Sequence, residues 1–217
     1  MNELILVAAS GLAREVAEAV AAAGSHRVVG IVDDDSRLHG VEISRIPVLG
    51  GLDQLVRHRH AQIVVCAGRG TARRAIVERL SAHGIQPGRF ATVIHPSVHL
   101  PRSGSIGAGS VLLAYVAITA DVHIGRHVVV MPNVTLTHDD VIGDYATLCA
   151  GVCIAGSVTV GANAYIGANA SIREHVQVGQ DAALGMGSSL ISDLPDEQTW
   201  AGVPAYQLVH IPPRENS

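Results

Sequence analysis

Residues 142–167 read IGDYATLCAGVCIAGSVTVGANAYIG, and an aliphatic residue stands at every sixth position of this stretch. The same step, continued in both directions, meets seventeen aliphatic residues without a miss from Ile94 to Leu190. Glycine often follows the aliphatic residue, and the fifth residue of each hexad is mostly small or valine. A six-residue period is typical of a parallel β-helix. Three hexads per coil predict a triangular prism roughly 27 Å tall at about 4.8 Å per coil.

The first 90 residues follow a different pattern, in which apolar strands alternate with amphipathic helices. Residues 36–58 are ambiguous, and PVLGG at 47–51 is interpreted as a turn before a short helix. Such alternation predicts a small parallel sheet, and so an α/β domain in front of the β-helix. The expected strands are 4–10, 27–35 and 63–68, and the expected helices are 12–24 and 71–84.

Composition excludes several classes of protein. A formal net charge of -4 without a cluster of basic residues argues against nucleic acid or an anionic membrane as partner. No apolar stretch approaches the roughly 18 residues of a membrane span. The N-terminus is unlike a secretory signal, so we expect a cytoplasmic protein. The three cysteines fit no disulfide framework, and Cys149 and Cys153 are interpreted as packing residues.

The stretch LTHDDVIGD at 136–144 interrupts the small and aliphatic residues of the repeat. His138 is the third residue of its hexad, which points outward or at a corner, and Ala120 and Gly156 lie one coil away on either side. Asp139 can hold the imidazole, so the pair suits general-base catalysis, with a backbone N–H near Gly156 for an oxyanion. Asp140 fills a position that is usually small; a turn toward solvent is one reading, and its role stays open.

Another column of third residues is nearly free of side chains. Such a column forms a smooth trough along the prism. A trough of this kind suits a narrow chain such as pantetheine, and it equally suits a packed interface between subunits. Both readings stay open. The column consists of Ala114, Pro132, Ala150, Ala168 and Met186.

Tandem [LIV]-G-x-x-x-x hexads resemble the left-handed parallel β-helix of the hexapeptide acyltransferases. Together with the small N-terminal domain, residues 3–206 are similar to bacterial sugar acetyltransferases, most closely to UDP-4-amino-sugar N-acetyltransferases. The resemblance implies acetyl-CoA as co-substrate and a homotrimer with active sites between subunits. It divides the chain into a Rossmann-like nucleotide-sugar-binding domain, an acyltransferase β-helix and a loose tail. These segments are residues 1–90, 91–206 and 207–217.

The same resemblance assigns roles on the β-helix. THDDVIG matches the family motif H-[ED]-x-x-I-G, which makes His138 the base and Asp139 its support. The thioester then lies near Gly156. The family's second active-site histidine corresponds to Thr147, half a coil away, which could meet His138 only across a subunit boundary. Further positions matching the acetyl-CoA cleft are Ala168, Gly185 and Met186.

In the N-terminal domain, VAASGLA at 7–13 follows the first strand and opens a helix, as a phosphate-binding turn does. It resembles the family's nucleotide-sugar turn, although Leu12 replaces the usual histidine. The alternative is a plain turn with a solvated acidic loop. At the other end, WAGVPAY at 200–206 resembles the turn that closes the coil stack. The matching substrate positions are Ser10, Gly11, Leu12, Asp33, Asp34 and Gly68.

We therefore predict an acetyl-CoA-dependent N-acetyltransferase that acts on a nucleotide-linked amino sugar, with no metal. The nearest alternative is acetylation of a sugar hydroxyl, such as that of sialic acid. A metal-dependent hydratase would need His123, His127 and His138 to converge, which their hexad positions argue against. A non-catalytic assembly or sugar-binding protein is the third alternative.

Overall fold

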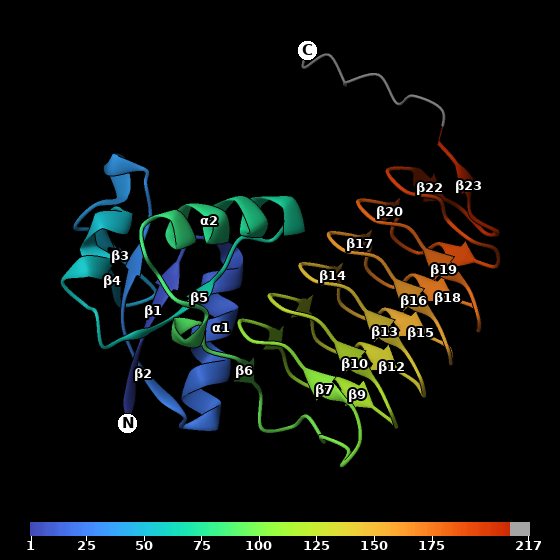
Figure 1. The fold of residues 1–217 in the computed structure, drawn as a ribbon, viewed down its shortest axis with the longest axis horizontal. Coiled ribbons are helices and arrows are strands. Elements are labelled where there is room, and N and C mark those ends of the chain that lie inside the picture. Colours follow the sequence, from blue (N-terminus) through green and yellow to red (C-terminus); the bar gives the residue numbers. More distant parts are fainter. Residues whose placement is uncertain (209–217) are drawn as a thin grey trace.

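A computed structural model describes residues 1–208 and shows an α/β domain beside a long stack of short strands (Figure 1). The first domain holds a five-stranded sheet in the order β3-β4-β2-β1-β5. Strands β1, β2, β4 and β5 are parallel, and β3 pairs antiparallel with β4. The bounds are β1 Asn2–Val7, β2 His26–Val32, β3 Glu42–Ile43, β4 Ile46–Gly50 and β5 Gln62–Val65.

Helices α1 (Gly11–Ala23) and α2 (Gly70–Ala82) cover opposite faces of this sheet. Alternate residues of β1 separate the two sides, since Leu4 and Leu6 pack with α1 whereas Ile5 and Val7 pack with α2. The segment 47–51, predicted as a turn, belongs mostly to β4, so that prediction was wrong. Three 3-10 helices complete the domain, at Ser36–Leu38, Leu52–Val56 and Pro87–Arg89.

The repeat forms a triangular prism of two-residue strands that pair parallel at a spacing of 18 residues, as Thr147 pairs with Tyr165. The β14 sheet contains β6 (Val93–Ile94), β8 (Val111–Leu112), β11 (Val129–Val130), β14 (Thr147–Leu148), β17 (Tyr165–Ile166), β20 (Ala183–Leu184), β22 (Thr199–Ala201) and β23 (Tyr206–Gln207). The β12 sheet contains β9 (Ala117–Ile118), β12 (Thr135–Leu136), β15 (Cys153–Ile154), β18 (Ser171–Ile172) and β21 (Ser189–Leu190). The β13 sheet contains β7 (Ser105–Ile106), β10 (His123–Ile124), β13 (Val141–Ile142), β16 (Thr159–Val160) and β19 (Gln177–Val178).

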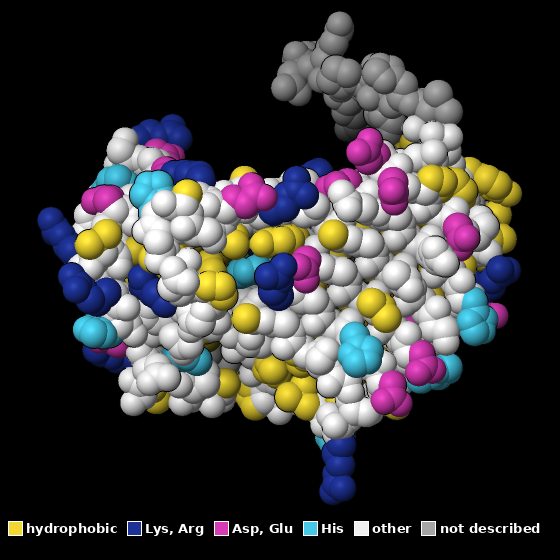
Figure 2. Space-filling view, viewed as in Figure 1, with side chains coloured by type: hydrophobic (Ala, Val, Ile, Leu, Met, Phe, Trp, Pro, Cys, Tyr) yellow, Lys and Arg dark blue, Asp and Glu magenta, His cyan; other side chains and the backbone are white. Residues whose placement is uncertain are grey.

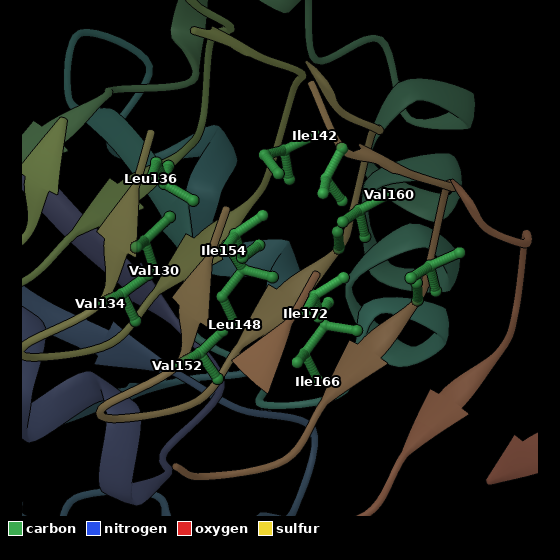
Figure 3. Packing of buried hydrophobic residues seen from close by; sticks show 14 of the residues in the cluster. Val130, Val134, Leu136, Ile142, Leu148, Val152, Ile154, Val160, Ile166 and Ile172 are labelled. Carbon is green, nitrogen blue, oxygen red and sulfur yellow. The ribbon is translucent and has the colours of Figure 1, made fainter. Parts of the chain in front are cut away.

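The aliphatic series fills the interior of the prism. Leu136, Ile154 and Ile172 stack on one another from successive coils and point inward together (Figure 3). The series is irregular at its start, where Leu100 is 46% exposed although the period places it inside. Trp200, in β22 of the antiparallel pair β22–β23, packs against the other end of the core. The predicted fold class, an α/β domain followed by a β-helix, is confirmed.

The fourth residue of each hexad turns the corners of the prism. From Tyr115 to Gly187 these residues have φ values between 54° and 72°. This left-handed region costs most side chains roughly 1–2 kcal/mol, and Asn and Asp tolerate it best. Asp139, with φ of 63°, is one of these corner residues, so the repeat itself fixes its backbone beside His138.

The two domains pack along the β14 sheet. Val111 and Val129 on the outer face of that sheet share a core with α1. The β12 and β13 sheets lie on the far side of the prism from the helices (Figure 1). None of the helices in residues 1–208 is long and apolar enough to cross a membrane. Gln207 still belongs to β23, and residues 209–217 of the predicted tail lie outside the described residues.

Candidate active site

His138 and Asp139 lie at the corner between β12 and β13, residues 137–140, which we call the His138 corner. The imidazole Nδ1 lies 2.8 Å from Asp139 Oδ2. A carboxylate only accepts, so in the neutral imidazole Nδ1 carries the hydrogen and Nε2 keeps a free lone pair. The two side chains are 64% and 60% exposed in the single chain. The corner therefore presents an imidazole of fixed orientation to an incoming molecule.

Gly156 lies one coil above His138 and forms the seat of its imidazole. A Cβ atom at 156 would overlap Cε1 of the ring and stand 2.5 Å from Nε2. The amide N–H of Gly156 makes no hydrogen bond within residues 1–208. The glycine thus lets the ring lie flat against the backbone and leaves a donor one coil away from the base.

Replacing Gly156 with alanine is expected to lower kcat for the predicted acetyl transfer by about 10–100-fold. The added methyl group would displace the imidazole of His138, and moving a catalytic group by ~1 Å lowers kcat by up to about this factor. Gly88→Ala is the matched control, since a Cβ there meets no atom within 4 Å. Steady-state kinetics and thermal unfolding of both variants check the prediction. Wild-type kcat in Gly156→Ala would show that the imidazole does not act from its position against Gly156.

Asp140 does not turn toward solvent; its side chain is buried inside the prism with no exposed area. Its two oxygens accept hydrogen bonds from the backbone N–H groups of Thr137 at 2.9 Å and Val158 at 3.0 Å. Burial raises the pKa of Asp140 to about 6, although these two hydrogen bonds act to lower the pKa. The fifth residue of a hexad points inward, and the solvent-facing reading of Asp140 was therefore wrong.

Thr147 lies on β14 and is buried where the two domains meet. Its hydroxyl donates to the carbonyl oxygen of Gly68 at 2.9 Å and accepts from Arg73 at 3.0 Å. The hydroxyl is therefore engaged in joining the domains. Its predicted contact with acetyl-CoA stays a prediction.

Sequence reasoning missed Arg73 and Gly70 of α2. Arg73 has no exposed area, and its guanidinium donates to five backbone carbonyls from both domains as well as to Thr147. A Cβ at Gly70 would overlap the carbonyl oxygen of Tyr145. One signal for Arg73 was available, because it falls on the same helical stripe as Val77 and Leu80, which are buried.

A cavity of about 360 Å³ lies between the domains, and we call it the interdomain cavity. It brings together Leu12 and Gly68, predicted to bind substrate, with Thr147. The guanidinium of Arg69 stands 5.6 Å from the ring centroid of Tyr165, a cation–π contact on the rim of the cavity. The remaining lining residues are apolar or carry a thiol: Val129, Met131 and Cys149.

A second cavity, of about 170 Å³, lies at the carboxyl ends of β1 and β2, and we call it the strand-end cavity. This is where open parallel sheets bind ligands. Asp33 and Asp34 line it. Asp33 accepts from the amide of Ala9 at 2.7 Å and so braces the turn before α1, whereas Asp34 forms an ion pair with Arg79 at 2.8 Å.

Ser10 caps α1, and Gly11 is the first residue of that helix. The Ser10 hydroxyl accepts from the amide of Ala13 at 3.3 Å and donates to the carbonyl of Cys66 at 2.5 Å. These bonds tie the turn after β1 to the end of β5, beside both cavities.

Replacing Ser10 with alanine is expected to destabilise the fold by about 1–2 kcal/mol, through loss of the helix cap and of the bond to Cys66. For a chain of this size that corresponds to roughly 2–8 °C in Tm. Ser25→Ala is the control, because Ser25 is exposed and its hydroxyl hydrogen-bonds, within residues 1–208, only with the side chain of His26. Equal melting temperatures for the two variants would contradict the capping role.

The remaining positions matched to acetyl-CoA lie elsewhere on the prism. Ala168 and Met186 stand at the corner between the β14 and β12 sheets, in successive coils, and Met186 is 80% exposed. Gly185 precedes Met186 in the same turn. A single chain therefore does not bring these residues to His138. They line a different edge of the prism.

The three histidines that a metal-dependent hydratase would need do not converge. His127 is buried and stacked on Tyr145 at 5.1 Å between ring centroids, and burial lowers its pKa to about 4. His123 lies on the outer face of the β13 sheet, with Nδ1 3.0 Å from Ser105 Oγ. Within residues 1–208 no group of three His, Cys, Asp or Glu side chains could share a metal ion.

The two cavities and the His138 corner lie on opposite sides of the prism. The strand-end cavity lies within the N-terminal domain and the interdomain cavity lies between that domain and the β14 sheet, while the corner joins the β12 and β13 sheets (Figure 1). On the face shown in Figure 2, basic side chains are scattered among acidic ones and form no continuous field. A molecule held in the strand-end cavity of one chain would thus face away from the imidazole of His138 in the same chain.

Two family profiles match the chain. Residues 3–80 match the PglD N-terminal domain, and residues 141–174 match the bacterial transferase hexapeptide repeat. The second match spans the stretch just after His138 and includes Gly156. No curated protein matches the chain significantly.

Solved structures match the whole architecture. The acetyltransferase domain of PglB from Neisseria gonorrhoeae, in complex with acetyl coenzyme A, is 31% identical over 96% of this chain and 100% of its own, with a TM-score of 0.85. PerB from Caulobacter crescentus, in complex with CoA and GDP-perosamine, is 28% identical over 96% and 98%, with a TM-score of 0.87. WeeI from Acinetobacter baumannii is 26% identical over 96% and 100%, with a TM-score of 0.87. The chain belongs to the hexapeptide-repeat sugar acetyltransferases that carry a PglD-type N-terminal domain.

Proposed function

We propose that this protein transfers the acetyl group of acetyl-CoA to the amino group of a nucleotide-linked sugar. The observation that carries the proposal is the imidazole of His138, held by Asp139 at 2.8 Å and seated on Gly156 with Nε2 free. Family membership supports the acyl donor, since PglB and PerB were crystallised with acetyl-CoA or CoA.

In the proposed reaction the sugar amine attacks the thioester carbonyl carbon while His138 Nε2 removes a proton from the nitrogen. The carbonyl oxygen gains negative charge, which the backbone N–H of Gly156, without a hydrogen-bond partner in residues 1–208, would stabilise. The C–S bond then breaks, the acetamide forms, and the thiolate of CoA takes up a proton. Asp139 stabilises the imidazolium that forms during the transfer. No covalent intermediate on the protein is required.

The nucleotide part of the acceptor fits the strand-end cavity. Asp34 and Arg79 there offer both an acceptor and donors for a base or ribose, and the separate interdomain cavity borders the β14 sheet. PerB holds GDP-perosamine, so a purine nucleotide is a candidate beside the UDP nucleotide predicted from the sequence. Leu12 and Tyr165 give the interdomain cavity apolar walls that suit the sugar ring.

A complete site requires a neighbouring chain, which supports the predicted homotrimer. His138 is 64% exposed in the single chain, whereas acyl transfer is favoured in a site closed to water. A second chain that covers the His138 corner would also place its own cavities and its Ala168–Met186 edge against the base. We place this reaction in the cytoplasm.

The proposal is tested by following release of the CoA thiol with a panel of UDP-, GDP- and dTDP-linked 4-amino sugars, each against its 4-hydroxy counterpart. Turnover with an amino sugar and none with the matched hydroxy sugar is the expected result. Turnover with sialic acid and none with any amine would establish hydroxyl transfer instead. No thiol release with any acceptor, from protein that binds CoA, would favour a non-catalytic role.

A further inference from the structure

The inward fifth position of the hexad is charged at only one place in residues 1–208. In the column that runs past the His138 corner, the residues on either side of Asp140 are Val122 and Val158, and Val176 follows. All four side chains are buried, with at most 3% exposed. Valine therefore satisfies the packing of this column, and a carboxylate is the exception in the coil that carries the base.

Asp140 changes the backbone hydrogen bonding of that coil. In the coils before and after it, Thr119 N–H donates to Leu136 O at 3.1 Å and Ala155 N–H donates to Ile172 O at 3.0 Å. The equivalent N–H of Thr137 donates instead to Asp140 Oδ2 at 2.9 Å. The Thr137 hydroxyl takes over the link to the next coil by donating to Ile154 O at 3.1 Å.

These bonds close a ring around the base. One oxygen of Asp140 holds the residue before His138, and the other holds Val158 in the next coil at 3.0 Å. The ring runs along the backbone from Thr137 to Asp140 and is closed by the bond between the Thr137 N–H and the Asp140 side chain, so it contains only His138 and Asp139 between these two residues. The short segment that carries the base is therefore fixed at both ends, and one end is anchored to the coil above.

We propose that Asp140 is a positioning residue for acetyl transfer, which holds the His138 corner in the conformation that seats the imidazole on Gly156. This inference rests on the proposed function of His138 as the base. Asp140 does not face the acceptor, because its side chain is buried, and it acts only through the backbone of Thr137 and Val158.

Burial makes this carboxylate unfavourable for folding. The charged form loses its water, and the pKa of Asp140 rises to about 6, with the charges of His138 and Asp139 acting in opposite directions on it. At pH 7.5 the group is ionised inside an aliphatic core. A residue that breaks a local rule of the fold beside an active site is expected to serve the reaction.

The test compares Asp140→Val, Asp140→Ser and Ser110→Ala. Valine is the residue that the column uses elsewhere. Serine at 140 keeps a link to the next coil, as Ser110 accepts from Val128 N–H at 2.9 Å, but it is too short to hold Thr137. Ser110→Ala is the control, because it removes an inward hydroxyl at a corner without a catalytic residue.

Both Asp140 variants are expected to lose kcat by about 10–100-fold with KM values changed less than about threefold, as for a misplaced catalytic group. Asp140→Val should melt at or above the wild-type temperature, and Ser110→Ala should keep wild-type kcat. Wild-type kcat in either Asp140 variant, or a loss of kcat matched by Ser110→Ala, would overturn the proposal.

A second readout does not depend on turnover. Amide hydrogen exchange should accelerate by more than about tenfold in Asp140→Val over residues 137–140 and at Val158, whose amide donates to Asp140, and stay unchanged over the equivalent corner at 173–176. This separates the two claims: inactive wild-type protein with accelerated exchange in the variant rejects the proposed function and keeps the anchoring. Active wild-type protein with unchanged exchange and unchanged kcat in the variant rejects the role of Asp140 alone.

Discussion

Replacing His138 with alanine is expected to lower kcat for acetyl transfer by about 10²–10⁴-fold, the usual contribution of a positioned general base. The KM values and Tm should stay near wild type, because the side chain is 64% exposed and, within residues 1–208, hydrogen-bonds only with Asp139. Removing it leaves the amine to lose its proton to water. Initial rates of thiol release, measured with the acceptor that the panel identifies, give kcat and both KM values.

His123→Ala is the matched control. Like His138, it is an exposed histidine of the prism with a single side-chain partner, but it lies on the outer face of the β13 sheet. It should keep wild-type kcat. An equal loss in both variants would contradict a single base and would favour histidines that act together. Activity that survives in His138→Ala would remove His138 from the reaction.

The prism was predictable because its rule is local and repeats. Every coil uses 18 residues, so the position of His138 and its neighbour Gly156 follows from counting, and the structure places the imidazole on that glycine. The same counting places Asp139 at a left-handed corner. The rule weakens where the stack begins, and there Leu100 is exposed against expectation.

Two kinds of residue could not be predicted by counting hexads alone: a residue whose charge and hexad position point to different surroundings, and a residue that contacts the first domain. A turn toward solvent was one reading of Asp140, yet its position in the hexad is an inward one, and the side chain is buried. Thr147 was interpreted through the family's second histidine, but its neighbours come from α2 and the end of β5. No repeat in the sequence encodes how the first domain lies on the prism.

Arg73 is the residue that fixes this arrangement, and replacing it with methionine is expected to destabilise the protein by about 3–5 kcal/mol. Its guanidinium donates to Ala67 and Gly68 of the first domain and to His127, Tyr145 and Ala146 of the prism, at 2.7–2.9 Å. Methionine fills much of the volume but leaves these buried carbonyls without a donor, at about 1–3 kcal/mol for each that water cannot reach. Thermal unfolding should shift down by roughly 6–20 °C.

Arg73→Met should also weaken binding of the acceptor more than binding of acetyl-CoA. Gly68 lines the interdomain cavity, so releasing its carbonyl should raise KM for the nucleotide sugar more than KM for acetyl-CoA.

Arg74→Met is the matched control: Arg74 is partly exposed and pairs only with Glu78 at 3.7 Å, an interaction worth less than about 0.5 kcal/mol. Burial lowers the pKa of Arg73 to about 10, which still leaves it charged at pH 7, so Arg73→Lys keeps the charge with fewer donors and should fall between the two. Equal Tm values for Arg73→Met and Arg74→Met would mean that apolar packing of α1 alone holds the domains together.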